Sequence, residues 1–209
     1  MTQGLPAPPS RYLRRVQWRR AHLAALDFEA TGLDFSRDSI ISFGIVPIDD
    51  GRIIMRDAAY GLVNPEVAPS RESVAIHGLR ARDLADAPGL DECRETLREG
   101  LSGRFLVTWW AEVETRFLEK IFGGGRRRLR ARTIDVRKLV LRLEAILGER
   151  RGPDEYTLAA TAARYRIPVA SPHHALDDAL VTAQLLLVVA PRLAARGHKT
   201  VRSLVRISR

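Results

Sequence analysis

Carboxylate side chains that could act together on one chemical group stand two residues apart near the start of this chain. Asp27 and Glu29 end a short apolar run, residues 22–28, that suits a buried strand. In a strand, this spacing points both carboxylates to one face, where they repel and raise each other's pKa unless a cation lies between them. Hard divalent cations prefer such oxygen ligands. The pair is a candidate metal site, although strand-end acids are often only solvated or cap a helix.

A second group of titratable residues begins an amphipathic segment late in the chain. It comprises His173, His174, Asp177 and Asp178. Acidic residues in a first helical turn are favoured by the helix dipole, and paired histidines can simply cap the turn. The alternative is that an imidazole with a pKa near neutrality accepts a proton beside the metal site. Spacing alone does not show that this turn meets the first strand.

A sheet covered by helices is expected to position both groups. Apolar runs predict strands at 22–28, 39–48, 52–63, 104–109 and 132–134, with a hairpin turn at 49–51. Helical patterns are predicted at 70–76, 90–101 and 112–122, from 135 to 147, at 156–165 and from 171 to about 195. Strands that meander first and later alternate with helices predict an α/β fold.

Basic residues gather in three segments of a chain whose net charge is +9. Residues 1–26, 123–142 and 192–209 carry +5, +7 and +6, so the remainder is acidic. This distribution predicts a polyanionic partner, although arginine could also be the default surface cation in a chain with three lysines. We divide the chain into a basic, proline-rich arm (1–20), a catalytic domain (21–195) and a basic tail (196–209). The three glycines at 123–125 predict a flexible arginine loop.

Composition excludes several classes of protein. No apolar run approaches the ~20 residues that cross a bilayer, and the N-terminal residues lack the apolar core of a signal peptide. Cys93 is the single cysteine, which excludes an internal disulfide and a zinc site built from several cysteines. We therefore expect a cytoplasmic protein without a membrane partner.

Three motifs in order carry a resemblance to a known family. They read LDFEATGL at 26–33, VAIHGLRARDLADAP at 74–88 and HHALDDALVTAQLL at 173–186. Together they resemble the DEDD superfamily of 3′→5′ exonucleases, in its histidine-bearing (DEDDh) branch, and especially the proofreading epsilon subunits of bacterial DNA polymerase III. The resemblance implies a ribonuclease-H-like α/β fold, a mixed β-sheet with antiparallel hairpin strands flanked by helices.

The resemblance also implies a reaction and the residues that perform it. Such enzymes hydrolyse single-stranded 3′ ends to nucleoside 5′-monophosphates with two Mg²⁺ or Mn²⁺ ions; we expect DNA rather than RNA as substrate, and a DNA polymerase as a further partner. The metal ligands would be Asp27, Glu29, Asp178 and, in the second motif, Glu114. His173 would be the general base. Contacts to the substrate are expected from Thr31, Gly32, Leu33, His77 and Trp110.

The choice between the two histidines depends on where the last helix begins. The family's histidine precedes its last aspartate by five residues, which selects His173. An unbroken helix would instead put His174 on the side of Asp178. Placing His173 in the loop before the helix resolves the conflict.

The second motif departs from the family pattern. WWAEVETRFL at 109–118 has Glu114 where the family has aspartate, and tryptophans where it has a polar pair. A carboxylate displaced by ~1 Å can cost ~100-fold in rate, so the substitution predicts reduced activity or a preference for Mn²⁺. Trp109 and Trp110 could be core residues or could stack on a base. The alternative function is a weakened or inactive nucleic-acid-binding module of the same fold, acting as a polymerase accessory.

Overall fold

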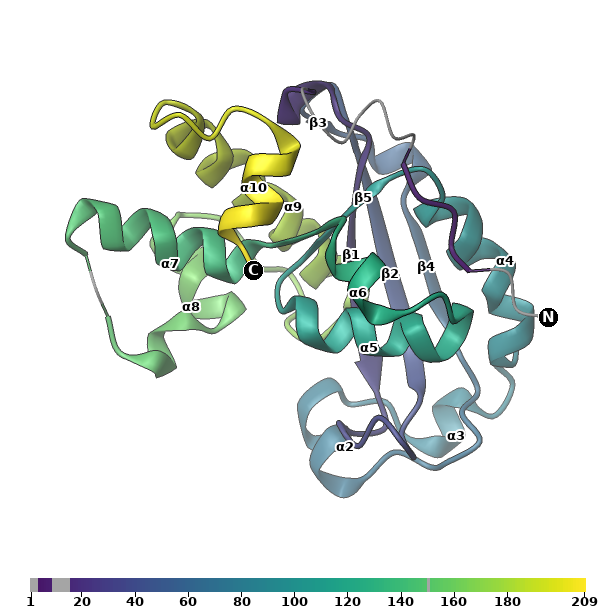
Figure 1. The fold of residues 1–209 in the computed structure, drawn as a ribbon. Helices are drawn as coiled ribbons and strands as arrows, with labels where there is room; N and C mark the ends of the chain where they lie inside the picture. Colours follow the sequence, from purple (N-terminus) through teal and green to yellow (C-terminus); the bar gives the residue numbers. More distant parts are fainter. Residues whose placement is uncertain (1–3, 9–15, 150) are drawn as a thin grey trace.

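The computed structural model describes residues 4–8, 16–149 and 151–209, and within them six strands form one mixed sheet (Figure 1). The strands are β1 (Leu23–Ala30), β2 (Ile40–Asp49), β3 (Arg52–Ile53), β4 (Ala59–Leu62), β5 (Phe105–Thr108) and β6 (Thr133–Asp135). Their order is β3-β2-β1-β5-β6, and β4 also pairs with β2. β1 is antiparallel to β2 and parallel to β5, so it is an inner strand. The expected α/β fold is confirmed.

Helices cover both faces of this sheet. The longer ones are α4 (Leu90–Leu101), α5 (Ala111–Phe122), α7 (Val136–Leu147) and α9 (Ala175–Ala194). The shorter ones are α2 (Arg71–His77), α3 (Ala81–Leu84), α6 (Arg126–Arg130), α8 (Leu158–Arg164) and α10 (Val201–Ile207). Three 3₁₀ turns complete the described elements: η1 (Trp18–Arg20), η2 (Met55–Asp57) and η3 (Pro153–Tyr156).

Alternation along β1 sends its side chains into two separate cores. Leu23 and Ala25 lie in a core shared with α7, α9 and α10. Ala24 and Leu26 lie in a second core, shared with α4, α5 and α6. Because side chains alternate with a period of two, Asp27 and Glu29 continue the row of Leu23 and Ala25. Both carboxylates are therefore on the face of the sheet that α9 covers.

The predicted hairpin is present, but its second strand is interrupted. Asp50 and Gly51 adopt positive φ angles of 50° and 68°, as a tight turn between antiparallel strands requires. Segment 52–63, predicted as one strand, forms β3 and β4 with the turn η2 between them. Both short strands pair with β2, so the interruption keeps the sheet edge but bends it.

The arginine segment after the three glycines is ordered, which corrects the prediction of a flexible loop. Residues 126–130 form helix α6, and its Leu129 is buried in the core beside α5. The amide of Arg126 also donates to Glu119 Oε1. The single apolar residue of this cationic segment, Leu129, packs in the core and orders the segment. The charge pattern of the sequence did not indicate this packing.

The ends of the chain also contain buried residues. Val201, Leu204 and Val205 of α10 pack into the core with α7 and α9, so the basic tail carries a packed helix. At the other end, Leu5 and Trp18 are buried. The part of the predicted arm that contains Tyr12 and Leu13 lies outside the described residues. Among the described helices, none has the length and apolar character needed to traverse a bilayer.

The first turn of α9 lies directly on the backbone of β2. A Cβ atom on Gly44 would be 2.3 Å from the Ala175 carbonyl oxygen and 2.4 Å from Leu176 Cα. Gly44 pairs with Asp27 across the two strands. The absent side chain thus lets α9 approach the sheet beside the carboxylates of β1.

We predict that Gly44→Ala lowers the free energy of unfolding by roughly 1–3 kcal/mol, because the new methyl group must displace helix backbone rather than a flexible side chain. Urea unfolding followed by tryptophan fluorescence measures the change. Gly89→Ala is the control: its Cβ would be 3.7 Å from the nearest atom, a Glu92 carboxylate oxygen. Equal stability of the two variants would contradict the close approach.

Candidate active site

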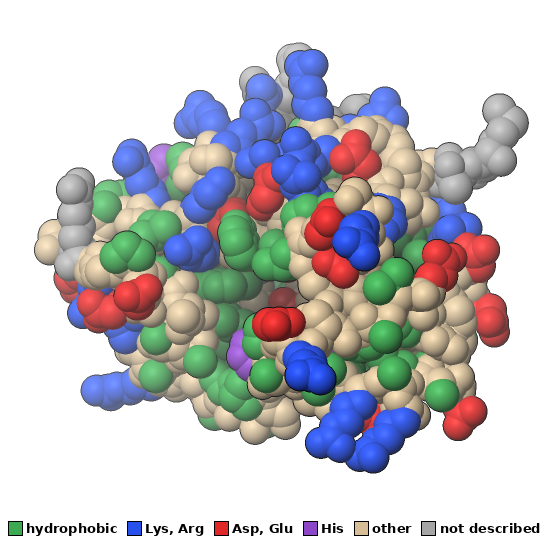
Figure 2. Space-filling view, turned by 90° about the horizontal axis from the view of Figure 1, so that it is seen from below, with side chains coloured by type: hydrophobic (Ala, Val, Ile, Leu, Met, Phe, Trp, Pro, Cys, Tyr) green, Lys and Arg blue, Asp and Glu red, His purple; other side chains and the backbone are tan. Residues whose placement is uncertain are grey.

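A cavity of about 560 Å³ opens where β1 ends. Figure 2 shows the hollow on this face of the molecule, with hydrophobic side chains around it and acidic side chains within it. The cavity is lined from β1, from the start of α5, from the segment 153–158 and from the turn that leads into α9. The sequence-predicted residues among its lining are Asp27, Glu29, Leu33, Trp110, Glu114, His173 and Asp178.

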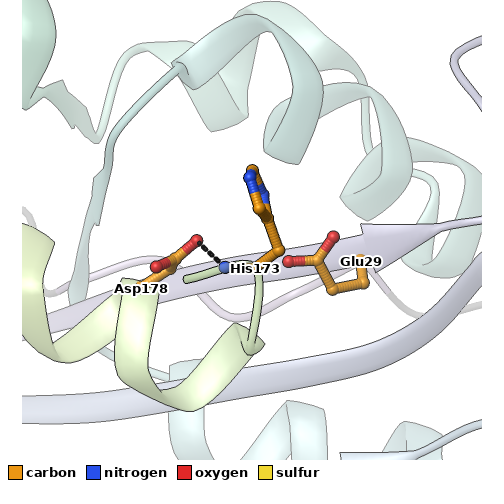
Figure 3. Close-up of side chains that lie close together, drawn as sticks. All are labelled: Glu29, His173 and Asp178. Carbon is orange, nitrogen blue, oxygen red and sulfur yellow. Dashed lines mark hydrogen bonds between the residues drawn. The ribbon is translucent and has the colours of Figure 1, made fainter. Parts of the chain in front are cut away.

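Two carboxylates and one imidazole meet at the centre of this site. Ligand atoms of Glu29, His173 and Asp178 all lie within 4.8 Å of one another. Both carboxylate residues are 9% exposed, whereas His173 is exposed. Figure 3 shows Glu29 and Asp178 on either side of His173. Residues far apart in the sequence thus offer oxygen and nitrogen atoms to one small space.

The turn before α9 separates the two histidines. His174 is the N-cap residue of α9, so His173 lies in the preceding loop, with a left-handed φ of 61°. Its amide donates to Asp178 Oδ2 at 3.2 Å. The ring of His174 stacks instead on Tyr60, with centroids 4.4 Å apart. The backbone conformation therefore presents His173 to the carboxylates and turns His174 away.

Burial raises the pKa of every carboxyl group in the cluster, and mutual repulsion raises the pKa of Asp27 and Glu29 further. Burial raises the pKa of Asp27 well above its usual range, and the carboxylates of Glu114, Glu29 and Asp178 raise it further. Burial and the charge of Asp178 raise the pKa of Glu29 to about 8. Burial is also the main cause of the raised pKa of Asp178. Such a cluster is stabilised by positive charge placed among its oxygens.

Glu114 joins this cluster from α5. The residue is 3% exposed, it lines the cavity, and its Oε2 has no hydrogen-bond partner among the described residues. Burial raises its pKa, and the charges of Asp135 and Glu29 add to the shift. A buried carboxylate oxygen without a donor is costly in a protein interior. Together with the mutual repulsion, this orphaned oxygen shows that the residues present fit a bound divalent cation.

The other predicted substrate contacts lie around the mouth. Leu33 is 59% exposed and also lines a second hollow of about 420 Å³, together with Gly32 and His77. His77 Nδ1 accepts from the amide of Leu79. Thr31 is engaged elsewhere: its hydroxyl donates to Asp38 and its amide to the Ser39 carbonyl. These hydrogen bonds of Thr31 therefore stabilise the loop between Thr31 and Ser39.

The two tryptophans have different environments. Trp109 packs partly buried against the core, Trp110 is 47% exposed, and both line the cavity.

Sequence reasoning missed Asp135 and Arg137. Asp135 is buried, and its carboxylate accepts from the amides of Ala111 and Lys138, which ties the start of α5 to that of α7. Arg137 lines the cavity. Asp135 ends β6, which is parallel to β5, and Arg137 follows it directly in α7. Because the carboxyl ends of parallel strands share one edge of the sheet, this position in the sequence could have indicated that both residues lie near the site.

Comparison with known proteins now adds to this geometry. The family model RNase_T, described as exonuclease, matches residues 24–186. The chain belongs to this exonuclease family. The resemblance to the DEDD exonucleases is thereby confirmed.

Individual relatives agree with this assignment. The chain is 30% identical over 174 residues, 81% of its length, to a PolC-type DNA polymerase III from Thermotoga petrophila. It is also 30% identical over 83% of its length to an epsilon-like DNA polymerase III subunit protein from Rhodobacter capsulatus. The matches span only 12% and 24% of those two relatives.

A solved structure supports the expected fold. Exonuclease X, determined with 5′-overhanging duplex DNA, superposes with a TM-score of 0.66 at 24% identity. The match covers 90% of the present chain and 99% of that structure's chain. The ribonuclease-H-like architecture expected from the sequence is confirmed.

We predict that Asp178→Asn stabilises the metal-free chain by about 0.5–2 kcal/mol, because one repelling charge leaves the cluster while an oxygen remains to accept from His173. Thermal unfolding with and without millimolar Mn²⁺ measures both this gain and the loss of stabilisation by metal. Asp177→Asn is the control, because it removes the same favourable charge from the first turn of α9, and it should keep the stabilisation by metal. A variant Asp178→Asn that matches this control would contradict the repulsive cluster.

Proposed function

We propose that the exonuclease removes nucleoside 5′-monophosphates from the 3′ ends of single-stranded nucleic acid, with DNA favoured. One observation carries the proposal: Glu29, His173 and Asp178 converge in the cavity that Asp27 also lines. Carboxylates clustered around an imidazole suit metal-assisted phosphodiester hydrolysis. The names of the polymerase III relatives and of the DNA-bound neighbour favour DNA.

The acidic cluster would hold two divalent cations, Mg²⁺ or Mn²⁺. The ligands would be Asp27, Glu29 and Asp178, with the Glu114 oxygen that lacks a partner as a further ligand. Bound there, such ions would stabilise charge on the attacking and leaving oxygens and make water a stronger acid. The ordinary preference of these ions for carboxylate oxygen agrees with the donor set.

His173 would act as the general base. Its imidazole is exposed to the cavity mouth and adjacent to Glu29 and Asp178. An imidazole can accept a proton from the attacking water near neutral pH and release it to solvent afterwards. The hydrogen bond from the His173 amide to Asp178 holds the loop in the conformation that presents the ring.

Leu33 and Trp110 would position the terminal nucleotides. Both are exposed large side chains at the cavity mouth. Stacking of a base on the Trp110 ring is worth ~1–3 kcal/mol and is largely indifferent to sequence. Gly32 and His77 in the adjoining hollow would contact the same strand end. Thr31 would contribute through the loop conformation that it fixes.

We further propose that the exonuclease acts together with a DNA polymerase. The relatives named above are DNA polymerase III proteins, of which the exonuclease matches a minor part. Co-purification with a polymerase from the native cell would support this partnership.

Stepwise shortening of a 5′-labelled single-stranded oligonucleotide tests the proposed reaction. We expect release of nucleoside 5′-monophosphates from the 3′ end with Mg²⁺ or Mn²⁺, and faster for DNA than for a matched RNA. Asp27→Ala should lower the rate by more than about 100-fold. Loss of a residue that only hydrogen-bonds a metal ligand typically lowers metal affinity or activity about 10–100-fold, and loss of a ligand itself should lower it further. A 3′-blocked oligonucleotide is the control and should stay intact. Shortening that Asp27→Ala leaves unchanged would contradict the assignment.

Glu114→Asp tests whether the longer side chain limits the reaction. We expect the Mg²⁺-supported rate to rise by up to ~100-fold, because the shorter side chain returns the carboxylate to the position usual in this family. Glu114→Gln, which keeps the shape and removes the charge, should instead lower the rate. A lower rate for Glu114→Asp than for the wild type would show that this site is adapted to glutamate.

A second candidate function rests on the same departure. The exposed Trp110 and the substituted Glu114 would suit a nucleic-acid-binding module that has lost turnover. Tight metal-independent binding of the oligonucleotide without shortening, by the wild type and by Glu114→Asp, would favour it.

A further inference from the structure

A further hollow, lined by basic residues, lies outside the active site. It has a volume of about 710 Å³, larger than the catalytic cavity. Its lining residues are Glu119, Gly125, Arg126, Arg127, Arg130, Ala131 and Arg209. Four of the seven carry guanidinium groups and one carries a carboxylate, so the surface is strongly cationic. We call it the arginine groove.

The positive charge of the arginine groove is only partly neutralised. Arg126 and Arg130 both bond the carboxylate of Glu112, which Arg116 also bonds. Three guanidinium groups therefore share one carboxylate. Arg127 is exposed and makes no ion pair with the described part of the chain. A surplus of fixed positive charge attracts a polyanion.

Contacts with the rest of the described chain fix the conformation of the arginine groove. Leu129 anchors α6 in the core, and the Arg126 amide donates to Glu119 Oε1. The shared carboxylate of Glu112 holds two of the guanidinium groups in place. Side chains fixed in this way lose less conformational freedom when a ligand binds.

Helix α5 connects the groove to the catalytic cavity. Glu114 faces the cavity, whereas Glu112, two residues earlier, is on another side of the helix and bonds the groove arginines. Trp110, directly before α5, stands at the cavity mouth. From Trp110 to Glu119 the helix advances ~13 Å, which is about four nucleotides at the spacing of a stacked strand. In Figure 2, many Lys and Arg side chains lie toward the edge of the face on which the cavity at the end of β1 opens.

We propose that the arginine groove binds the sugar-phosphate backbone of the nucleic-acid strand upstream of the 3′ end that occupies the cavity. The strand passes Trp110 and follows α5 to Arg126, Arg127 and Arg130. The inference rests on the proposed function for the identity of the strand, and it assigns a binding surface that the reaction itself does not need. Substrates longer than about four nucleotides gain affinity from the groove, and shorter ones do not.

The test compares two double variants of equal charge. Arg127→Ala/Arg130→Ala removes two groove arginines, and Arg128→Ala/Arg202→Ala removes two arginines that do not line the groove. Arg128 lies on the same helix α6 but lines a different pocket, so the pair separates position from net charge. Fluorescence anisotropy without metal measures binding of a labelled single-stranded dodecamer at several salt concentrations. Hydrolysis of p-nitrophenyl thymidine 5′-phosphate, which occupies only the cavity, is measured beside it.

We expect the groove variant to reduce the slope of log affinity against log salt by ~2, about one for each phosphate contact, and to bind the dodecamer more weakly than the control. Both variants should hydrolyse the small ester like the wild type and bind a trinucleotide equally. Equal dodecamer binding by the two double variants would overturn the groove assignment and leave the proposed function intact. Groove-dependent binding with no hydrolysis would support the groove and refute the reaction.

Discussion

The contact between α9 and the backbone of β2 at Gly44 is the constraint on which the active site depends. It brings the first turn of the last long helix against the strand pair that carries Asp27 and Glu29. His173 and Asp178 come with that turn, from the other end of the sequence. Without a residue lacking a side chain at this point, α9 would stand further from the sheet, and the carboxylates could not share one cavity.

The same contact creates an electrostatic conflict that the rest of the fold must offset. Four carboxyl groups with raised pKa values surround one cavity, which costs folding free energy. Two hydrophobic cores on opposite faces of the sheet supply the compensation, at about 1.5–3 kcal/mol for each large apolar side chain buried. Packing elsewhere in the fold thus offsets the repulsion between the carboxylates, and bound cations would reduce that repulsion.

Helix α5 has a double role in this arrangement. Asp135 fixes its first turn, so Glu114 is carried into the cavity although its side chain differs from the family's aspartate. The opposite side of the same helix gathers guanidinium groups around Glu112. One rigid element therefore separates a negative cavity from a positive groove, and a polyanion with bound cations is complementary to both.

The sequence by itself determined the local elements and the chemical types. The period-two and helical patterns identified β1, β5 and α4, because each signal is encoded in neighbouring residues. The resemblance to the family selected His173 over His174, and the structure places His173 in the loop before α9. Only the tertiary structure decided that Gly44 admits α9, that Arg137 reaches the cavity and that α6 is ordered through Leu129. These depend on contacts between segments distant in the chain, whose distances no local periodicity records.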